Sequence, residues 1–519
     1  MRIEHFIRNS ALAFPHKVAL VADERRLTFG DLDRLSDRLA CVLCERGVAP
    51  GDRVIVFMDN CWQAVVAIFA VMKAGAILCP IHPSTKAPKL AWLLGHCRAS
   101  AMILQDRLAA SAAAALTGAH SVNLTVMTGE ADRSGLRDSI RFDDAIAGSA
   151  APPPHVPAAG ADQDVAMLIY TSGSTGLPKG VMITHQNAVA SSSSVISYLE
   201  NTSDDIILNV LPIAFSYGLY QVLMAARLGA TLVLEKSFVF PHSVFEKLAA
   251  ERATGFPIVP AITSSILQMK SLQPGAFSHL RYITNAGSAL PPSHAERLQE
   301  LFPAARIYSM YGMTECHRGT WLPPDQLRSH PGSVGIAIPN TEAYVGDEFG
   351  NKVAPGTVGE LVIRGAHVMK GYWENEAATD QALRPGPCPG EKVLHTGDLF
   401  RSDERGYLYF VARKDDIIKS GAQKVSPKEV ENVIYALPGI LEAAVVGVPD
   451  PVLGMAIKAV VVVAPEADLT PRDVMLHCSR QLEDFMVPKI VEFHEGLPKT
   501  ESGKIRRRQV ASEISEAEE

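Results

Sequence analysis

Residues 168–180 read LIYTSGSTGLPKG, and this stretch decides the fold and the chemistry that the chain predicts. The apolar run at residues 165–170 predicts a buried strand that enters a loop of small and hydroxylated residues. Gly173 and Gly176 allow main-chain N–H groups to turn inward and approach an anion closely. The loop adds hydroxyl or ammonium donors at Thr171, Ser172, Ser174, Thr175 and Lys179. These donors predict a site for a polyphosphate.

The spacing of this loop differs from that of the Walker A loop. Five residues after Gly173 stands Pro178, where the Walker A pattern requires a glycine before its lysine. A flexible Ser/Gly linker is the structural alternative. Such linkers seldom follow a buried strand and end in Pro-Lys-Gly, so we favour the phosphate site.

Composition limits the classes of protein to consider. With 519 residues, about two to four domains are expected. A net charge of −7 without a long basic run argues against nucleic acid as a partner. The N-terminus lacks the apolar run of a signal peptide, and Gln63 and Lys73 interrupt the longest apolar stretch. We therefore expect no membrane span and a cytoplasmic location.

Helix and strand patterns alternate along the chain. Capping-box patterns begin at Thr28 and Ser426, and a third helix start follows Thr470. Strand-like runs occupy residues 53–58, 231–234, 443–448 and 456–463. This alternation predicts an α/β architecture. The eight cysteines are scattered, and Cys41 and Cys44, although spaced as CxxC, favour core packing over metal or redox chemistry.

Four more motifs follow the phosphate loop in order: Tyr311-Gly-Met-Thr-Glu315, Thr396-Gly-Asp398, Arg413-Lys-Asp-Asp-Ile-Ile-Lys-Ser-Gly421 and Pro498-Lys-Thr-Glu-Ser-Gly-Lys504. Together the five motifs resemble those of the adenylate-forming superfamily, which includes acyl- and aryl-CoA synthetases, amino-acid adenylation domains and luciferases. The resemblance implies a large N-terminal domain of layered β-sheets and helices, residues 1–414, that binds acid and ATP. A small, mobile C-terminal α+β lid domain, residues 415–519, would carry the catalytic lysine.

The chemistry that the resemblance implies is activation of a carboxylate by ATP. AMP in a mixed anhydride is a good leaving group, and cations and N–H donors stabilise the charge that develops at the α-phosphorus. Lys504 matches the family's catalytic lysine, and Thr314 would donate to phosphate. Glu315 would bind Mg²⁺, which takes few carboxylates together with phosphates.

The same motifs imply how the nucleotide and the thiol are held. The Tyr311 ring would stack on adenine, and Asp398, joined by Arg413, would bind the ribose hydroxyls. Gly312 would let the acyl carbonyl approach the backbone.

The lid domain would then turn about Asp415 and bring Gly421 to the site, where the lack of a side chain leaves room for a pantetheine arm. The family usually has two glycines there, whereas this chain has Gly421-Ala422.

The acid pocket is expected at Leu211-Pro-Ile-Ala-Phe-Ser-Tyr-Gly218 and at Gly287. Amino-acid-activating members of the superfamily have an Asp at the position of Ser216. Because a buried ammonium without a carboxylate partner is costly, an α-amino acid substrate is disfavoured. Phe215 stands where many acyl- and aryl-CoA synthetases have His, so the identity of the acid stays open.

We expect an AMP-forming ligase that uses ATP and Mg²⁺ to activate a non-amino carboxylic acid. The chain ends soon after Lys504, so we expect the acyl group to pass to a separate phosphopantetheine thiol, on coenzyme A or on a discrete carrier protein. The closest alternative is a ligase that loads a proline-like amino acid onto a carrier protein. A luciferase-type oxygenase and a non-catalytic nucleotide-binding module are further alternatives, but the module would not need Lys504, Glu315 and Asp398.

Overall fold

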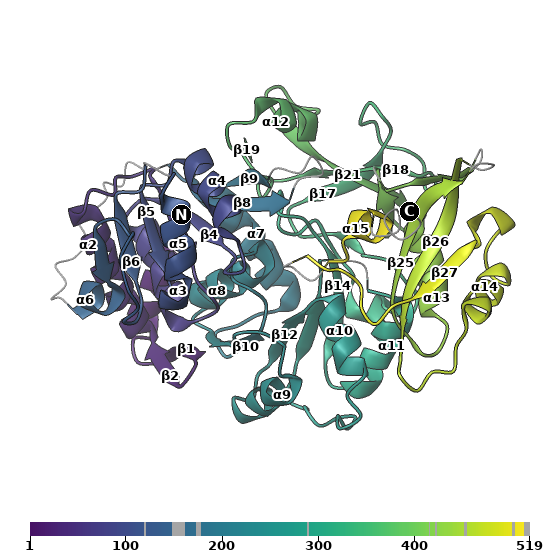
Figure 1. The fold of residues 1–519 in the computed structure, drawn as a ribbon, viewed down its shortest axis with the longest axis horizontal. Helices are drawn as coiled ribbons and strands as arrows, with labels where there is room; N and C mark the ends of the chain where they lie inside the picture. Colours follow the sequence, from purple (N-terminus) through teal and green to yellow (C-terminus); the bar gives the residue numbers. More distant parts are fainter. Residues whose placement is uncertain are drawn as a thin grey trace.

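Two β-sheets with helices between and outside them form the larger part of the molecule (Figure 1). The computed structural model describes residues 1–118, 121–147, 161–172, 178–287, 290–414, 416–420, 423–450, 454–500 and 504–512. Both sheets are parallel at their centres and carry antiparallel strands at an edge.

A sheet with nine strands among the described residues contributes one wall of the site. In spatial order it contains β16 (Ile336–Ala337), β15 (Thr320–Trp321), β14 (Arg306–Tyr311), β13 (Tyr282–Asn285), β12 (Gly255–Ile258), β10 (Ile206–Asn209), β11 (Thr231–Leu234), β1 (Val18–Ala22) and β2 (Arg25–Thr28). The strands from β14 to β1 run parallel, so their carboxyl ends meet at one edge.

The eight-stranded sheet of the described chain carries the phosphate-loop strand. In spatial order it contains β19 (Gly371–Tyr372), β9 (Pro178–Thr184), β8 (Val165–Ser172), β4 (Ile77–Ile81), β3 (Arg53–Phe57), β5 (Ala101–Leu104), β6 (Leu124–Met127) and β7 (Ser139–Arg141). The predicted strand at residues 165–170 is therefore present as β8, and β9 returns antiparallel to it.

The helices form three layers around these two sheets. The layer between the sheets contains α1 (Glu4–Ala13), α2 (Phe29–Glu45), α3 (Trp62–Lys73) and α8 (Ser216–Leu228). The outer face of the eight-stranded sheet is covered by α4 (Ala87–Cys97) and α5 (Ala109–Leu116), and that of the nine-stranded sheet by α9 (Pro241–Ala250), α10 (Pro260–Leu267) and α11 (Pro292–Leu301). The remaining helices of this part are α6 (Phe142–Ala147), α7 (His185–Leu199) and α12 (Glu376–Ala382).

The apolar pattern explains this layering. Val54 and Val56 of β3 pack into the central layer, whereas Ile55 and Phe57 face the outer helices, as the two-residue period of a strand requires. Helix α3 is apolar on nearly every side and lies buried between the sheets. None of the helices in the described ranges has the length and apolar character to cross a membrane.

Local capping agrees with most of the sequence prediction. Thr28 and Asp31 form a complete capping box at the start of α2, and Thr470 and Asp473 form one at α14 (Pro471–Ser479). At α13 (Pro427–Tyr435), only half of the predicted box is present: the Ser426 side chain accepts from the N–H of Glu429. The Ser426 hydroxyl is also directed at the carbonyl of Val411, 2.5 Å away.

A smaller antiparallel sheet connects the layered domain to the C-terminal domain. It contains β17 (Glu342–Gly346), β18 (Gly359–Arg364), β21 (Lys392–Ser402) and β20 (Leu383–Pro385), with β22 (Leu408–Arg413) paired to β21. Asp398 on β21 lies opposite Arg413 on β22, where the chain leaves this sheet.

The C-terminal domain has its own core. Its strands are β23 (Ile418–Ser420), β24 (Gln423–Val425), β25 (Ile440–Asp450), β26 (Gly454–Val463) and β27 (Ile490–Phe493). Helices α13 and α14 cover one face of the sheet formed by β25, β26 and β27, and α15 (Arg507–Ser512) packs on the other. A large layered domain followed by a small α+β domain confirms the predicted fold class. The boundary between residues 414 and 415 stays a prediction, and Asp415 lies outside the described residues.

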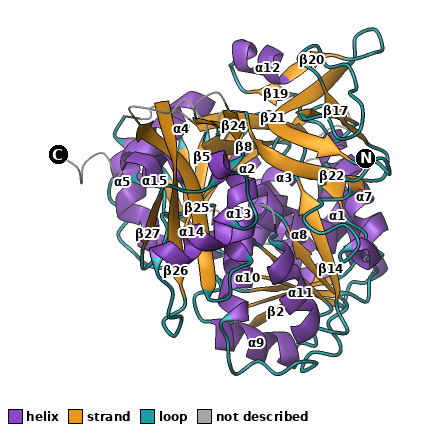
Figure 2. Ribbon diagram, turned by 90° about the vertical axis from the view of Figure 1, so that its right-hand side faces the viewer, coloured by secondary structure: helices purple, strands orange, loops and turns teal. Residues whose placement is uncertain are grey.

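The C-terminal domain contacts α10 and α11 of the larger domain (Figures 1 and 2). Ser264 donates its hydroxyl to the carbonyl of Leu441 at 3.4 Å, and Ser293 donates to that of Tyr435 at 3.3 Å. The His294 and Tyr435 rings meet edge to face with centroids 5.3 Å apart. These contacts, with the Lys270–Glu466 ion pair at 2.9 Å, hold the C-terminal domain against the larger domain.

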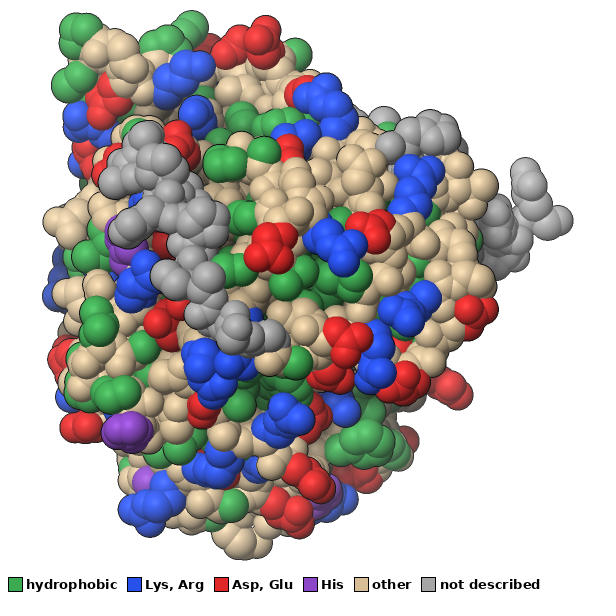
Figure 3. All heavy atoms as spheres, turned by 90° about the vertical axis from the view of Figure 1, so that its left-hand side faces the viewer, with side chains coloured by type: hydrophobic (Ala, Val, Ile, Leu, Met, Phe, Trp, Pro, Cys, Tyr) green, Lys and Arg blue, Asp and Glu red, His purple; other side chains and the backbone are tan. Residues whose placement is uncertain are grey.

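The face of the layered domain in Figure 3 is mixed in charge. Lys and Arg side chains alternate there with Asp and Glu side chains. This mixture agrees with the small excess of acidic residues in the composition.

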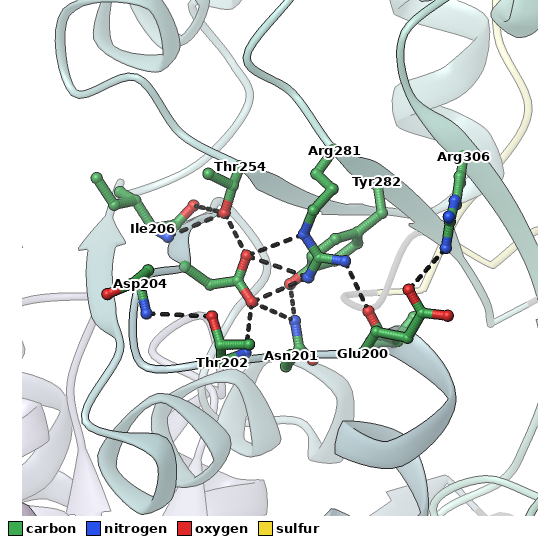
Figure 4. A network of polar contacts seen from close by, with 11 residues as sticks. Glu200, Asn201, Thr202, Asp204, Ile206, Thr254, Arg281, Tyr282 and Arg306 are labelled. Atoms are coloured by element: carbon green, nitrogen blue, oxygen red, sulfur yellow. Dashed lines mark hydrogen bonds and ion pairs between the residues drawn. The ribbon is translucent and has the colours of Figure 1, made fainter.

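A partly buried ion pair holds together the amino ends of three strands in the nine-stranded sheet (Figure 4). Arg281, just before β13, donates to Asp205, just before β10, with an Nη2–Oδ2 distance of 2.9 Å. Asp205 also accepts from the Thr254 hydroxyl at 2.7 Å and from the Asn201 amide at 3.0 Å. Burial raises the pKa of Asp205, but these hydrogen bonds outweigh it and lower the pKa.

Candidate active site

The phosphate-loop hairpin brings Thr171 and Lys179 opposite each other at the ends of β8 and β9. Residues Gly173, Ser174, Thr175 and Gly176 lie outside the described residues, as does the side chain of Ser172. The Lys179 amine lies 5.2 Å from the centroid of the Tyr372 ring. The Gly180 carbonyl accepts from the N–H of Trp373 at 2.8 Å. Strand β19 therefore fixes the lysine side of the loop.

Residues 312–319 form a tight loop between β14 and β15. The N–H of Gly319 donates to the carbonyl of Tyr311 at 2.9 Å and closes the loop. A Cβ atom on Gly312 would lie 2.1 Å from the carbonyl oxygen of His317, so only glycine fits there. This steric reason was not part of the sequence prediction for Gly312. The predicted approach of an acyl carbonyl stays a prediction.

Glu315 projects from this loop toward the phosphate-loop hairpin. Its side chain is buried, and its Oε1 atom accepts from the Tyr372 hydroxyl at 2.7 Å. Burial and the nearby Glu315 charge both raise the pKa of Tyr372, so the phenol keeps its proton. Tyr372 thus contacts both Lys179 and Glu315. Thr314 precedes Glu315 on the same loop and is partly exposed.

Asp398 is the centre of a second polar group. Its Oδ2 atom accepts from the Tyr311 hydroxyl at 2.7 Å, and its Oδ1 atom accepts from Arg413 Nε at 2.9 Å. Burial, and then the Asp398 charge, raise the pKa of Tyr311. The Asp398 charge is also the main cause of the raised pKa of Arg413. The structure brings together the three residues predicted to bind adenosine, and that role stays a prediction.

Glu360, which the sequence prediction missed, supports this group from β18. Its Oε1 atom accepts from the N–H of Gly397 at 2.9 Å, and its Oε2 atom lies 3.2 Å from both His395 Nδ1 and Lys414 Nζ. Burial raises the pKa of Glu360, but these partners outweigh it and lower the pKa to about 2. A single carboxylate inside the apolar run Gly359-Glu-Leu-Val-Ile-Arg364 was the available sequence signal.

Lys504 comes to this site from the C-terminal domain. The side chain keeps accessible surface, yet the protein atoms around its amine lower its pKa by desolvation, and the charge of Arg413 lowers it further. The charges of Asp398 and Glu315 act in the opposite direction. The lysine therefore lies within electrostatic range of all three residues. Gly421, like Asp415, lies outside the described residues.

The predicted acid-pocket residues lie around the start of α8 and the carboxyl end of β13. Phe215 stacks on His82, with centroids 5.2 Å apart and an interplanar angle of 14°, and Ser216 is the first residue of α8. The Tyr217 hydroxyl donates to the carbonyl of Thr284 at 3.0 Å and joins α8 to β13. Gly287 follows β13 with φ +97°, a conformation that favours glycine.

A buried arginine that the sequence prediction missed lies beside Tyr217 of the predicted acid pocket. Arg318 follows Glu315 by three residues and is 4% exposed. Its guanidinium carbon lies 4.1 Å from the centroid of the Tyr217 ring. The available signal in the sequence was Arg318 itself, a second charged residue close to Glu315.

The donor set at Glu315 fits Mg²⁺. Within the described ranges, no cluster of three or more His, Cys, Asp and Glu side chains is arranged to hold a metal ion. Mg²⁺ is usually bound by one or two carboxylates together with substrate phosphates and water, so a single carboxylate beside a phosphate loop is sufficient.

Two families of known proteins match the chain. The AMP-binding enzyme family matches residues 7–373, and the AMP-binding enzyme C-terminal domain matches residues 429–504. The chain is 32% identical to the long-chain-fatty-acid–CoA ligase of Escherichia coli O157:H7, over 96% of this chain and 93% of that protein. It is 34% identical to a feruloyl-CoA synthase of Amycolatopsis sp, over 96% of each.

Solved structures agree with these matches. The anthranilate CoA ligase AuaEII, in complex with anthranoyl-AMP, superposes with a TM-score of 0.91 at 25% identity, covering 100% of this chain and 98% of that one. ATP-bound MatB from Rhodopseudomonas palustris gives a TM-score of 0.87 at 28% identity, covering 100% of both chains. The chain therefore belongs to the AMP-binding enzyme family, within the adenylate-forming superfamily, and is an AMP-forming acid–thiol ligase.

Proposed function

We propose that the chain joins a carboxylic acid to the thiol of coenzyme A in two steps at one site. In the first step, a carboxylate oxygen attacks the α-phosphorus of ATP and pyrophosphate leaves. In the second step, the thiol attacks the carbonyl of the acyl adenylate and AMP leaves. The observation that carries this proposal is the position of Lys504, which the C-terminal domain brings within electrostatic range of Asp398, Arg413 and Glu315.

Each residue of the nucleotide side has a role in this scheme. Lys504 stabilises the charge that develops between the acid and the α-phosphate, an effect typically worth about 10²–10³ in rate. Asp398, oriented by Tyr311 and Arg413, accepts hydrogen bonds from the ribose. The phosphate loop with Lys179 holds the outer phosphates, and Thr314 donates to phosphate. Glu315, kept in place by Tyr372, holds Mg²⁺, which neutralises phosphate charge when it is bound.

Coenzyme A is the acceptor named for the curated relatives, and we propose it here. A discrete carrier protein offers the same phosphopantetheine thiol and is the alternative acceptor. The second step needs Lys504 to leave, and we propose that the C-terminal domain turns about Asp415 and places Gly421 beside the thiol arm. Free coenzyme A and ATP are substrates of the cytoplasm, which is the compartment we propose.

The acid is a non-amino carboxylic acid in this proposal. Ser216 has no charge with which to pair an ammonium, and the buried guanidinium of Arg318 repels one. Both features disfavour a proline-like substrate. The names of the relatives cover fatty and aromatic acids, so they do not narrow the acid further.

Acid-dependent exchange of pyrophosphate into ATP tests the proposal. Purified full-length protein is offered fatty, aromatic and amino acids, and the active acid is then tested with coenzyme A and with a holo-carrier protein. We expect exchange with at least one non-amino acid and thioester formation on coenzyme A. Release of ADP, or no nucleotide cleavage with any acid, would contradict the proposal.

A further inference from the structure

Arg318 is a buried cation that has no acidic partner among the described residues. Its side chain donates from Nη1 to the carbonyl of His317 at 2.9 Å, while its Nε atom is buried without a hydrogen-bond partner. In the part of the chain that the structure describes, no Asp or Glu forms an ion pair with it. Side-chain hydrogen bonds also link the guanidinium to the Tyr198 and Tyr217 phenols, so Nε is the donor that remains unused inside the protein.

Arg281 shows what a structural arginine looks like in the same sheet. It lies at the opposite end of the strands, where three of its donor atoms contact the Asp205 carboxylate or the Leu199 carbonyl (Figure 4). Its charge is balanced by a carboxylate that is itself fully hydrogen-bonded. Arg318 is more deeply buried than Arg281 and lacks such a carboxylate.

The groups around Arg318 do not supply a negative charge. Its guanidinium faces the Tyr217 and Tyr198 phenols, whose pKa values are raised by burial and lowered less strongly by Arg318, so both phenols stay neutral. On the same loop, His317 stacks on Tyr220 with centroids 3.6 Å apart. Burial, and then the Arg318 charge, lower the pKa of His317, so this ring is neutral as well.

An unbalanced buried charge destabilises the fold unless a ligand completes it. Removing one partner of a buried ion pair is strongly destabilising, because the other charge is left in a medium of low polarity. Free Arg318 corresponds to this half-complete state. Side chains that break the packing rules in this way are typical of functional sites.

The position of Arg318 places this cation on the acid side of the site. Tyr217, which it contacts, belongs to the segment 211–218 that is expected to line the acid pocket. Glu315, on the same loop, instead contacts Tyr372, whose ring lies beside Lys179 of the phosphate-loop hairpin. One loop therefore carries an anion for the nucleotide side and a cation for the acid side.

We propose that the preferred acid carries a second anionic group, a distal carboxylate, and that Arg318 is the residue that recognises it. The substrate class is then the dicarboxylic acids, activated at one end and held by Arg318 at the other. This inference rests on the proposed acid–thiol ligase function. It also explains why an ammonium substrate is disfavoured although Ser216 alone does not exclude one.

Matched acids test the inference through pyrophosphate exchange with the full-length protein. The pairs are hexanedioate and hexanoate, octanedioate and octanoate, decanedioate and decanoate, and terephthalate and benzoate. For at least one pair we expect the diacid to have a kcat/KM about 100-fold higher, the effect of a charged hydrogen bond. Arg318→Met should remove this preference and leave activity with the monoacid, and Arg318→Lys should keep part of it.

Arg227→Gln is the matched control. Arg227 is on α8, like Tyr217, and contacts the Val189 carbonyl, the Ser192 hydroxyl and the Phe6 ring rather than a carboxylate. This variant should retain the diacid preference. The inference would be overturned if the wild type preferred the monoacid of every pair. It would also be overturned if Arg318→Met lost kcat/KM equally with both acids of each pair. Equal loss would mean that Arg318 serves the reacting carboxylate or the loop.

A thermal-shift measurement separates failure of the inference from failure of the proposed function, because it needs no turnover. The preferred diacid should raise the Tm of the wild type and not that of Arg318→Met. Without acid, Arg318→Met should be as stable as the wild type or more stable, since a buried charge is removed. A large fall in Tm together with no diacid effect would assign Arg318 a structural role. If no acid supports pyrophosphate exchange, but the diacid still raises the Tm in a way that depends on Arg318, only the proposed ligase function would be overturned.

Discussion

The nucleotide side and the acid side of the site differ in how their polar groups are paired. On the nucleotide side, Asp398 has Tyr311 and Arg413, Glu315 has Tyr372, and Glu360 has three donors. On the acid side, Arg318 Nε and His317 Nδ1 are buried without partners among the described residues, as are both amide atoms of Asn285 at the end of β13. The described carboxylates of the nucleotide side are thus oriented by protein partners, whereas these groups have unused hydrogen-bonding capacity.

This difference indicates which groups serve the nucleotide and which groups select the acid. Every acid that the enzyme activates needs the same nucleotide chemistry, so pre-oriented groups serve all of them and need no reorganisation during the reaction. The acid differs from one ligase to another, and unpaired groups reject molecules that do not complete them. Changes on the nucleotide side should therefore affect all acids equally, and changes on the acid side should affect them unequally.

The largest effect is expected from Lys504→Ala. Loss of the cation that the C-terminal domain supplies should reduce acyl-adenylate formation about 10²–10³-fold with every acid. Transfer from supplied acyl-AMP to coenzyme A should be largely spared, because we propose that Lys504 leaves before this step. Pyrophosphate exchange measures the first reaction, and thioester formation measures the second. An equal loss in both reactions would argue against a domain that alternates between two positions.

Asp398→Asn should have the next largest effect. The amide loses the charge that pairs with Arg413 and one acceptor for the ribose, so the KM for ATP should rise about 100-fold. The factor should be the same for the best acid and for a poor one. Initial rates over a series of ATP concentrations, with two acids, check this. A factor that depends on the acid would mean that the two sides are not independent.

Acid pH should remove the contribution of His367, which contacts the backbone of Arg318, before that of Glu360. Burial lowers the pKa of His367 from 6.5 to about 4, although the nearby backbone of Arg318 raises it. The neutral ring thus stabilises the fold above pH 6.5, and this contribution is lost as the pH falls from 6.5 toward 4. Between about pH 7 and pH 5, the free energy of unfolding of His367→Gln should therefore fall by about 2 kcal/mol less than that of the wild type.

Urea unfolding at the two pH values measures this difference, with Glu360→Gln as the control. The lowered pKa of Glu360 means that its contribution is present above pH 4.5 and is lost only as the pH falls toward about 2. The control should therefore keep the wild-type slope between about pH 7 and pH 5. An unchanged slope in His367→Gln would show that His367 is not buried in the neutral form.

Ser216→Asp should give the smallest effect, confined to the acid side. A carboxylate at the first position of α8 provides a partner for an ammonium, so exchange with α-amino acids should increase about tenfold relative to the best acid. The nearby Arg318 charge opposes a larger gain. Rates for a panel of amino acids check the ratio. No change in the ratio would mean that Ser216 does not line the pocket.

The motifs predicted the family and the fold class because their residues carry chemistry that depends on local spacing. The strand before the phosphate loop, the capping box at Thr28 and the apolar helix α3 follow from patterns within a few residues. Glu360, Tyr372 and Arg318 escaped prediction because each contacts its partners across long separations in the chain. Asp398 and Arg413, by contrast, were predicted as a pair from motifs and meet on neighbouring strands.

The sequence alone gives the α/β class and the ligase family, and it predicts a phosphate loop, a carboxylate for the ribose and a catalytic C-terminal lysine. These features depend on residue type and local order, which a linear chain displays directly. The folded structure adds that Glu315 and Arg318, three residues apart on one loop, have different partners: Glu315 contacts Tyr372, and Arg318 contacts Tyr217. The energetic contribution of a charged side chain depends on its burial and on its partners, and both are set by elements that meet only in the folded protein.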